Sequence, residues 1–126
     1  MLSYQHAYHA GNAADVHKHS LLTVALNYLT KKDKALSYIE THAGRGLYDL
    51  TDAAAQKTGE AAQGVARMLQ SFPRDHDYVE MLGTFRATHG PDAYPGSPLI
   101  AAQLLRRFDR IDLAELHPAE HAELVQ

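Results

Sequence analysis

The stretch Ala35-Leu36-Ser37-Tyr38-Ile39-Glu40-Thr41-His42-Ala43-Gly44-Arg45-Gly46 decides the fold class of this chain. Residues 35–40 form a short apolar run with β-forming side chains, and residues 41–46 form a glycine-bearing segment. This pattern predicts a buried strand that runs into a flexible loop. Residues 110–116 alternate apolar and polar side chains and predict a second strand, ending at Glu115. Two strands separated by helices predict a parallel sheet and therefore an α/β fold.

Helical patterns occupy much of the remaining chain. Apolar residues recur at helical spacing over about residues 13–31, where Asn12 or Asp15 can cap the helix. Two more helices are predicted over residues 61–72 and 77–88, and we expect them to form an antiparallel hairpin.

The C-terminal third contains two further helix starts. The Ser97-Pro98 pair predicts one, with the Ser97 hydroxyl accepting an orphan amide. The other lies at His117-Pro118, and the sequence stops at Gln126 within that helix. Because two parallel strands alone bury little apolar surface, we expect either that something else completes the sheet or that the chain is a fragment.

Composition narrows the class of protein. The 126 residues suit one domain, and 12 Lys+Arg against 15 Asp+Glu give a net charge of −3, which argues against a generic polyanion binder. No apolar run is long enough to cross a membrane and no secretory signal is visible, so a cytoplasmic location is expected. The absence of cysteine excludes disulfides, thiolate metal sites and cysteine nucleophiles. No Walker loop, nucleophile elbow or zinc-protease motif supports a hydrolase.

The predicted strand ends suggest a ligand site. In open α/β sheets ligands bind at the carboxyl ends of strands, where glycine admits a close backbone and a carboxylate accepts hydrogen bonds from ribose hydroxyls. Gly44, Gly46 and Glu115 suit a nucleoside-containing cofactor. A nicotinamide cofactor is disfavoured, since a third glycine is missing and the acidic residue follows after roughly 70 positions instead of about 20.

Each of these residues also has a simpler explanation. The glycines can serve an ordinary turn with positive φ, and Glu115 can cap the helix that begins at Pro118. His42 can donate to a cofactor or satisfy its own backbone.

The N-terminal segment is rich in aromatic and titratable side chains. They are Tyr4, His6, Tyr8, His9, Asp15, His17, Lys18 and His19. A metal site is disfavoured because His17 and His19, two apart on a helix, point to different faces. A polar lid that stacks on a flipped-out base and a partly ordered tail both remain open. A basic cluster near residue 106, Arg106, Arg107 and Arg110 around Phe108, is best explained as a solvated helix end.

Five motifs in order resemble one known family. They are Met1-Leu2-Ser3-Tyr4 with His6, the run His9-Ala10-Gly11-Asn12 with Ala14-Asp15-Val16 and Lys18-His19, Thr41-His42-Ala43-Gly44, Tyr94-Pro95-Gly96-Ser97-Pro98, and Glu115-Leu116-His117-Pro118. Together they span the chain, which resembles the RlmJ family of bacterial methyltransferases that act on an adenine amine in large-subunit ribosomal RNA.

The resemblance implies a fold and a domain layout. It implies a Rossmann-like methyltransferase sheet that binds S-adenosylmethionine, with the C-terminal half of the sheet absent from this chain. Residues 1–49 would hold the N-terminal arm, first helix and first strand, residues 50–93 an inserted helical subdomain, and residues 94–126 the return to the sheet.

The resemblance also implies residue roles. Cofactor contacts would come from Lys18, His42, Ser97 and Glu115, joined by Gly44 of the loop, while Tyr4 would meet the substrate adenosine. The implied partner is ribosomal RNA, protein-free or in early assembly, with no metal and no membrane; the oligomeric state is left open.

One departure from the family is large. Its members hold the target amine with an Asp-Pro-Pro-Tyr motif, and no Pro-Pro pair occurs in these 126 residues. The chain is therefore expected to be an N-terminal portion that has no catalytic residue of its own and transfers no methyl groups alone. The alternatives are a non-catalytic nucleic-acid-binding module, or a protein for utilisation of external DNA, a label that some relatives carry.

Overall fold

A computed structural model describes residues 4–126, so that Met1, Leu2 and Ser3 of the first motif lie outside the described residues. The elements follow in the order η1 (His6–Tyr8), α1 (Ala13–Leu29), β1 (Ser37–Glu40), β2 (Leu47–Asp49), α2 (Ala53–Thr58), α3 (Glu60–Gln63), α4 (Val65–Met68), η2 (Leu69–Ser71), α5 (Asp77–His89), β3 (Ala93–Pro95), α6 (Ser97–Leu104), β4 (Arg110–Leu113) and α7 (Pro118–Leu124). No helix among residues 4–126 is both long and apolar enough to cross a membrane.

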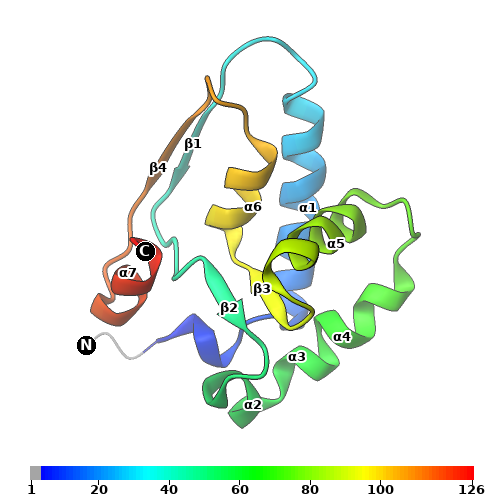
Figure 1. Ribbon diagram of the computed structural model, residues 1–126, viewed down its shortest axis with the longest axis vertical. Coiled ribbons are helices and arrows are strands. Elements are labelled where there is room, and N and C mark those ends of the chain that lie inside the picture. Colours follow the sequence, from blue (N-terminus) through cyan, green and yellow to red (C-terminus); the bar gives the residue numbers. More distant parts are fainter. Residues whose placement is uncertain (1–3) are drawn as a thin grey trace.

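The strands form two small sheets (Figure 1). β1 and β4 pair in parallel, with Tyr38 opposite Ile111 and Glu40 opposite Leu113, as predicted. β2 and β3 pair antiparallel, with Tyr48 opposite Tyr94. The fold is thus mixed α/β, and the second sheet was not predicted from the sequence.

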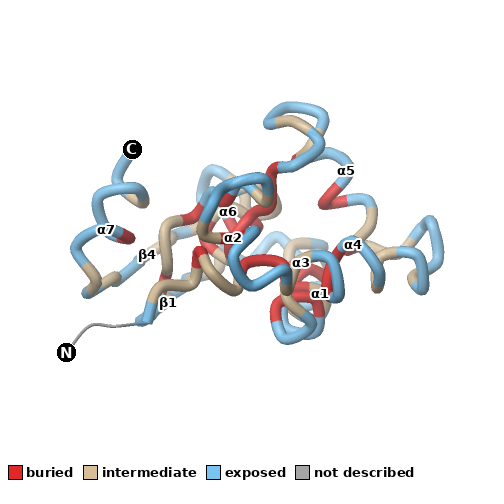
Figure 2. The backbone as a smooth tube through the Cα atoms, turned by 90° about the horizontal axis from the view of Figure 1, so that it is seen from below, coloured by how far each residue is buried: buried red, intermediate tan, exposed pale blue. Residues whose placement is uncertain are grey.

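Helices α1 and α6 pack against each other, and α6 also contacts β4 (Figure 1). The Asn12 side chain caps α1 by accepting from the Asp15 amide at 2.8 Å, in agreement with one of the two predicted caps. Figure 2 shows buried backbone gathered around α1 and α6, with α7 at one side largely exposed. The core includes Tyr78 of α5, Tyr94 of β3 and Ile100 of α6, each with 0% exposure.

The predicted helix over residues 61–72 is wrong in its continuity. The region consists of three short pieces, α3, α4 and η2, with a break at Gly64. The Gly64 amide still donates to the Glu60 carbonyl within the helix, but the next amide, that of Val65, donates to the Gly11 carbonyl at 2.8 Å. The predicted antiparallel hairpin is also wrong, because α5 packs mainly against α1 and β3. An additional helix, α2, lies before this stretch.

Two other local predictions need correction. Gly96, not Ser97, is the N-cap residue of α6, and the Ser97 hydroxyl donates to Glu40 Oε2 at 2.7 Å instead of capping the helix. β4 ends at Leu113, two residues before Glu115.

Within the basic cluster near residue 106, Arg107 and Arg110 are exposed beyond the end of α6, as predicted, but Arg106 is a structural tie. The Arg106 guanidinium donates to the carbonyl oxygens of Thr30, Lys32 and Lys34 and to the Asp109 carboxylate. It also lies over the Phe108 ring at 4.4 Å. Arg106 thereby joins the connection between α1 and β1 to the turn before β4.

Candidate functional site

The loop after β1 and the residues after β4 run together beyond the strands. The Ala114 amide donates to the Glu40 carbonyl at 2.8 Å, and the Ala43 amide donates to the Ala114 carbonyl at 3.0 Å. This extension of the parallel pairing brings Glu115 beside the glycine loop, where the Gly44 amide donates to Glu115 Oε2 at 2.7 Å. The predicted meeting of the glycine loop with the Glu115 carboxylate is confirmed.

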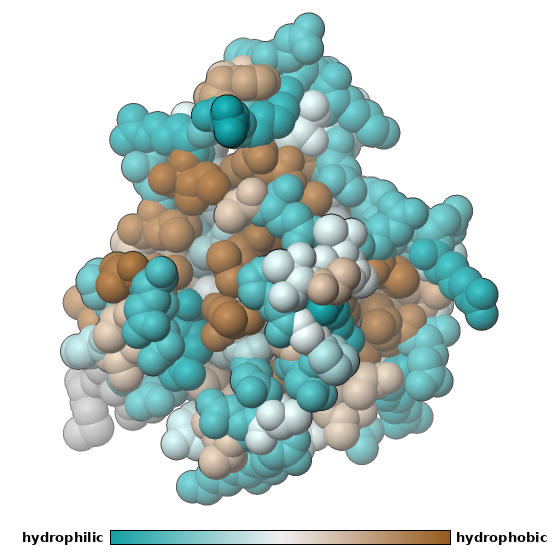
Figure 3. All heavy atoms as spheres, in the orientation of Figure 1, coloured by the Kyte–Doolittle hydropathy of each residue, from teal (hydrophilic) through white to brown (hydrophobic). Residues whose placement is uncertain are grey.

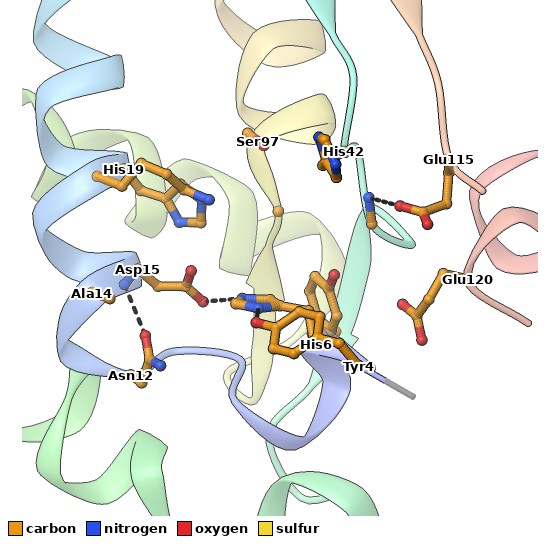
Figure 4. A pocket seen from close by; sticks show the side chains of 14 residues that line it. Tyr4, His6, Asn12, Ala14, Asp15, His19, His42, Ser97, Glu115 and Glu120 are labelled. Atoms are coloured by element: carbon orange, nitrogen blue, oxygen red, sulfur yellow. Dashed lines mark hydrogen bonds and ion pairs between the residues drawn. The ribbon is translucent and has the colours of Figure 1, made fainter. Parts of the chain in front are cut away.

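A cavity of about 360 Å³ opens at this meeting point (Figure 4). The six residues to which the resemblance gives a role line it: Tyr4, Lys18, His42, Gly44, Ser97 and Glu115. Gly46, the other glycine of the loop, is not among the lining residues; its φ is +87°, and it faces Leu99 and Leu124. The other lining residues are His6, Asn12, Ala14, Asp15, His19, Tyr48, Gly96 and Glu120. Residues from both ends of the chain thus share one pocket, although their roles there remain predictions.

Glu115 keeps hydrogen-bonding capacity for a ligand. Its Oε2 accepts from Gly44 and its Oε1 from the His117 amide at 2.9 Å, and because a carboxylate offers about four lone-pair positions, about two remain. Burial raises the pKa of Glu115, but the amides of His117 and Gly44 outweigh it, so that the pKa lies below its ordinary value and the group is ionised at neutral pH. Glu115 is not the cap of α7, since the His117 side chain accepts from the Ala119 amide.

Gly44 is required by space as well as by backbone conformation. Its φ is +73°, which side chains rarely adopt, and a Cβ atom would lie 2.5 Å from the Tyr48 hydroxyl. That hydroxyl accepts from the Arg45 amide at 3.3 Å, and the Tyr48 ring is 4% exposed. The simpler explanation of Gly44, a turn with positive φ, is therefore correct but incomplete.

Ser97, Lys18 and His42 present different groups to the cavity. The Ser97 hydroxyl donates its hydrogen bond to Glu40, so the hydroxyl oxygen remains free to accept one from a ligand. Lys18 and His42 are exposed at the pocket rim. His42 Nδ1 shares a hydrogen bond with the neighbouring Thr41 hydroxyl at 2.9 Å, which leaves its Nε2 available.

The N-terminal segment from Tyr4 onward is held against this pocket. The Tyr4 hydroxyl lies 2.6 Å from His6 Nδ1, and His6 Nε2 lies 2.6 Å from Asp15 Oδ2 (Figure 4). Burial raises the pKa of Asp15, but the hydrogen bond and charge of His6 and the Gly11 amide outweigh it and lower that pKa. Asp15 is therefore an ionised anchor for the segment, and the Tyr4 ring, 63% exposed, stands at the pocket rim.

His19 is a pocket residue that the sequence analysis did not select for the site. It is 1% exposed, and its Nδ1 lies 2.8 Å from the Tyr94 hydroxyl, which in turn lies 3.0 Å from the Tyr78 hydroxyl. Burial lowers the pKa of His19 to about 4, so the ring is neutral at neutral pH. Its spacing of four residues from Asp15, on one helix face, is the sequence signal that could have identified it.

The predicted divergence of His17 and His19 is confirmed, because His17 is exposed and His19 is buried. Within residues 4–126, no three His, Asp or Glu side chains are placed to hold a metal ion together.

Comparison with known proteins places this mixed α/β chain, with its pocket at the carboxyl ends of parallel strands, in a family. Residues 33–126 match the family model described as "Ribosomal RNA large subunit methyltransferase D, RlmJ". The chain belongs to this family.

Two curated relatives and one solved structure are similar over nearly the whole chain. One relative is the Escherichia coli (strain K12) protein named "Ribosomal RNA large subunit methyltransferase J", which is 44% identical over 124 residues. The other is the protein of the same name from Haemophilus influenzae (strain ATCC 51907 / DSM 11121 / KW20 / Rd), which is 43% identical over 127 residues. Each alignment covers 96% of this chain. A crystal structure of a Legionella pneumophila protein assigned to family model DUF519 aligns with a TM-score of 0.78 and 42% identity over 93% of this chain. The chain spans only 44% of the length of each of these proteins.

Proposed function

We propose that this chain is the cofactor-holding, N-terminal portion of an S-adenosylmethionine-dependent enzyme that methylates the N6 amine of an adenine in large-subunit ribosomal RNA. The observation that carries the proposal is the contact between Gly44 and Glu115 at the end of two parallel strands, inside a cavity that Tyr4, Lys18, His42 and Ser97 also line. Membership of the family and the names of the two curated relatives support the reaction class.

The chemistry of the pocket fits S-adenosylmethionine. The spare lone pairs of Glu115 suit ribose hydroxyls, and the Lys18 ammonium group suits the carboxylate of the methionine part. Ser97 offers an acceptor and His42 a ring nitrogen. The Glu115 carboxylate, bonded only to backbone amides, places a negative charge on the lining that suits a cation. When bound, the cofactor supplies a methyl group on a positively charged sulfur.

Tyr4 is proposed to meet the substrate adenine. Its ring is exposed at the rim and stacks on His9, with centroids 5.3 Å apart and planes 3° from parallel, which leaves the opposite face of the ring for a base. Stacking on an aromatic platform is a common way to hold an extruded base.

The proposal extends to the whole fold. β1 and β4 would be neighbouring strands of a Rossmann-like methyltransferase sheet, residues 50–93 its inserted helical subdomain, and residues 1–49 and 94–126 the parts that build the sheet. The Asp-Pro-Pro-Tyr residues that hold the target amine would come from the part of the full-length relatives that this chain does not span, since no Pro-Pro pair occurs in it. Ribosomal RNA is the proposed partner.

Calorimetric titration with S-adenosylhomocysteine tests the cofactor site. Glu115→Ala is expected to weaken binding by about 1.5–3 kcal/mol, or about 10- to 150-fold, because a charged acceptor is lost. Glu123→Ala, an exposed change of the same charge on α7, is the matched control and should bind as the original chain does.

A 2′-deoxy analogue of S-adenosylhomocysteine sharpens this test. If Glu115 holds the ribose, the analogue binds the original chain more weakly than the parent ligand does, and Glu115→Ala removes that difference. Equal affinity of the original chain and Glu115→Ala for the parent ligand would rule out a role for this carboxylate. Binding of ribosomal RNA fragments without any binding of S-adenosylhomocysteine would favour the non-catalytic nucleic-acid-binding alternative.

A further inference from the structure

The N-terminal arm, residues 4–12, is fastened by the helical segment of residues 58–65 as well as by α1. The Thr58 hydroxyl donates to the Tyr8 carbonyl at 2.5 Å, and the Val65 amide donates to the Gly11 carbonyl at 2.8 Å. These contacts join segments that are far apart in the sequence. The arm therefore has a second anchor, independent of the bond between His6 and Asp15.

Glu60 is the side chain at the centre of this second anchor. Both of its carboxylate oxygens lie 3.1 Å from His9 Nδ1, and Oε2 accepts from Asn12 Nδ2 at 3.2 Å. These hydrogen bonds lower the pKa of Glu60, the one to His9 most strongly. One carboxylate thus bonds to the arm at His9 and to the residue that caps α1, Asn12.

Gly64 lets the two backbones approach. A Cβ atom on this residue would lie 2.1 Å from the Gly11 carbonyl oxygen and 2.7 Å from the Asn12 Cα atom. The break between α3 and α4 therefore occurs where the helical segment meets the arm.

The anchor reaches the pocket through His9. The His9 ring bonds to Glu60 and stacks on the Tyr4 ring at 5.3 Å. By holding the His9 ring in place, Glu60 also holds the surface on which the Tyr4 ring stacks at the rim of the cavity.

We propose that Glu60 is a positioning residue: by holding His9 and Asn12 it docks the N-terminal arm and sets the place of Tyr4 at the pocket. The value of that placement for a substrate base rests on the proposed function, whereas the docking itself does not. The segment of residues 58–65 does not line the cavity, but it positions the arm that does.

Hydrogen exchange of single backbone amides measures the docking directly in the 126-residue chain. The amides of Tyr8, His9, Gly11 and Asn12 are hydrogen-bonded in the docked arm, to Gln5, His6, Asp15 and His9. Glu60→Ala is expected to speed their exchange about fivefold, the factor that corresponds to about 1 kcal/mol, because two partly exposed hydrogen bonds to the arm are lost. Adding Thr58→Val should speed it further, and Glu60→Gln should restore part of the protection.

The exchange pattern separates positioning from general stability. A merely structural role of Glu60 would speed exchange in the arm and in the cores of α1 and α5 alike. Glu80→Ala, an exposed charge change on α5, is the matched control and should leave the arm amides as they are.

Tyr4→Trp provides a second readout at the pocket, because the chain contains no tryptophan. In this background Glu60→Ala should lower the fluorescence anisotropy of the introduced indole and increase its quenching by acrylamide, while Glu80→Ala changes neither. Unchanged arm amides and an unchanged indole signal in Glu60→Ala would overturn the proposal, as would an equal acceleration of all core amides.

Titration of the same variants with S-adenosylhomocysteine separates this proposal from the proposed function. Glu60→Ala should bind it within about twofold of the original chain, since Gly44 and Glu115 are untouched. Glu60→Ala can loosen the arm while neither the original chain nor any variant binds S-adenosylhomocysteine. In that case the docking role stands and the cofactor proposal fails.

Discussion

Gly44 lies where both the backbone and its surroundings exclude a side chain. Its positive φ costs a non-glycine residue about 1–2 kcal/mol, and the Tyr48 hydroxyl occupies the position next to a Cβ atom. These two effects can be separated by mutation, because only the second depends on Tyr48.

Gly44→Ala is expected to lower the free energy of unfolding by more than the cost of the positive φ alone, because the new Cβ atom also meets the Tyr48 hydroxyl. In a Tyr48→Phe background, where this hydroxyl is absent, the same change should lower the free energy of unfolding by a smaller amount. Chemical denaturation of the four proteins of this double-mutant cycle measures the difference. If the cost of Gly44→Ala were the same with and without the Tyr48 hydroxyl, the clash would have no part in the requirement for glycine.

His19 is a second residue whose surroundings determine its chemistry. The unfolded chain binds a proton on this ring below pH 6.5 and the folded chain only below about pH 4, because burial opposes the charge. Between those values the unfolded state holds more protons, so this contribution to stability is full above pH 6.5 and is lost as the pH falls towards 4.

We therefore expect the stability of the original chain to fall by roughly 3 kcal/mol more than that of His19→Gln between pH 6.5 and 4. Urea denaturation at several pH values measures both profiles, and taking their difference cancels the other titrating groups. Parallel profiles would show that His19 has the same pKa in the folded and unfolded chain, and that burial does not lower it.

At the scale of elements, the Arg45–Glu120 pair ties α7 to the loop after β1. The Arg45 guanidinium donates from Nε and from a terminal nitrogen to the two oxygens of Glu120, at 3.0 and 2.7 Å. The Glu120 side chain is 3% exposed and lines the cavity. The hydrogen bonds to Glu120 raise the pKa of Arg45. One wall of the pocket thus depends on a short helix held by one buried carboxylate.

Glu120→Ala leaves the Arg45 charge without its partner, and we expect it to cost roughly 3 kcal/mol of stability. Arg45→Ala combined with Glu120→Ala should cost less than the sum of the single changes, because neither charge is then left unpaired. Thermal or chemical unfolding measures the cycle, and strict additivity would mean that the pair does not hold α7.

At the scale of the whole molecule, apolar surface is left uncovered. Leu21, Val24 and Tyr28 lie on one face of α1 and are 59%, 42% and 60% exposed. Figure 3 shows further apolar side chains over the region of β1, β4 and α6. Among the described residues β1 and β4 pair only with each other, so each has a free edge. Such edges and faces favour association.

We expect the 126-residue chain to self-associate in a concentration-dependent way, which sedimentation equilibrium measures. Leu21→Lys with Tyr28→Lys should reduce this association. His17→Lys, an exposed change on the same helix, should not reduce it. If the chain stays monomeric at high concentration, both before and after these changes, the exposed face of α1 does not mediate self-association.

The amino-acid sequence by itself determined the elements whose signal is local. The apolar run before the glycine loop predicted β1, the alternation over 110–116 predicted β4, and the periodicity after Asn12 predicted α1. Because parallel strands end at one edge, these local patterns were enough to predict that Gly44 and Glu115 meet.

The tertiary structure alone decided the contacts between segments far apart in the chain. The pairing of β2 with β3, the bond from Ser97 to Glu40, the burial of His19 against Tyr94 and the break at Gly64 against Gly11 have no periodic signature. Each depends on which polar group or backbone atom the fold brings within reach, because a buried polar group needs a hydrogen-bond partner wherever in the chain that partner comes from.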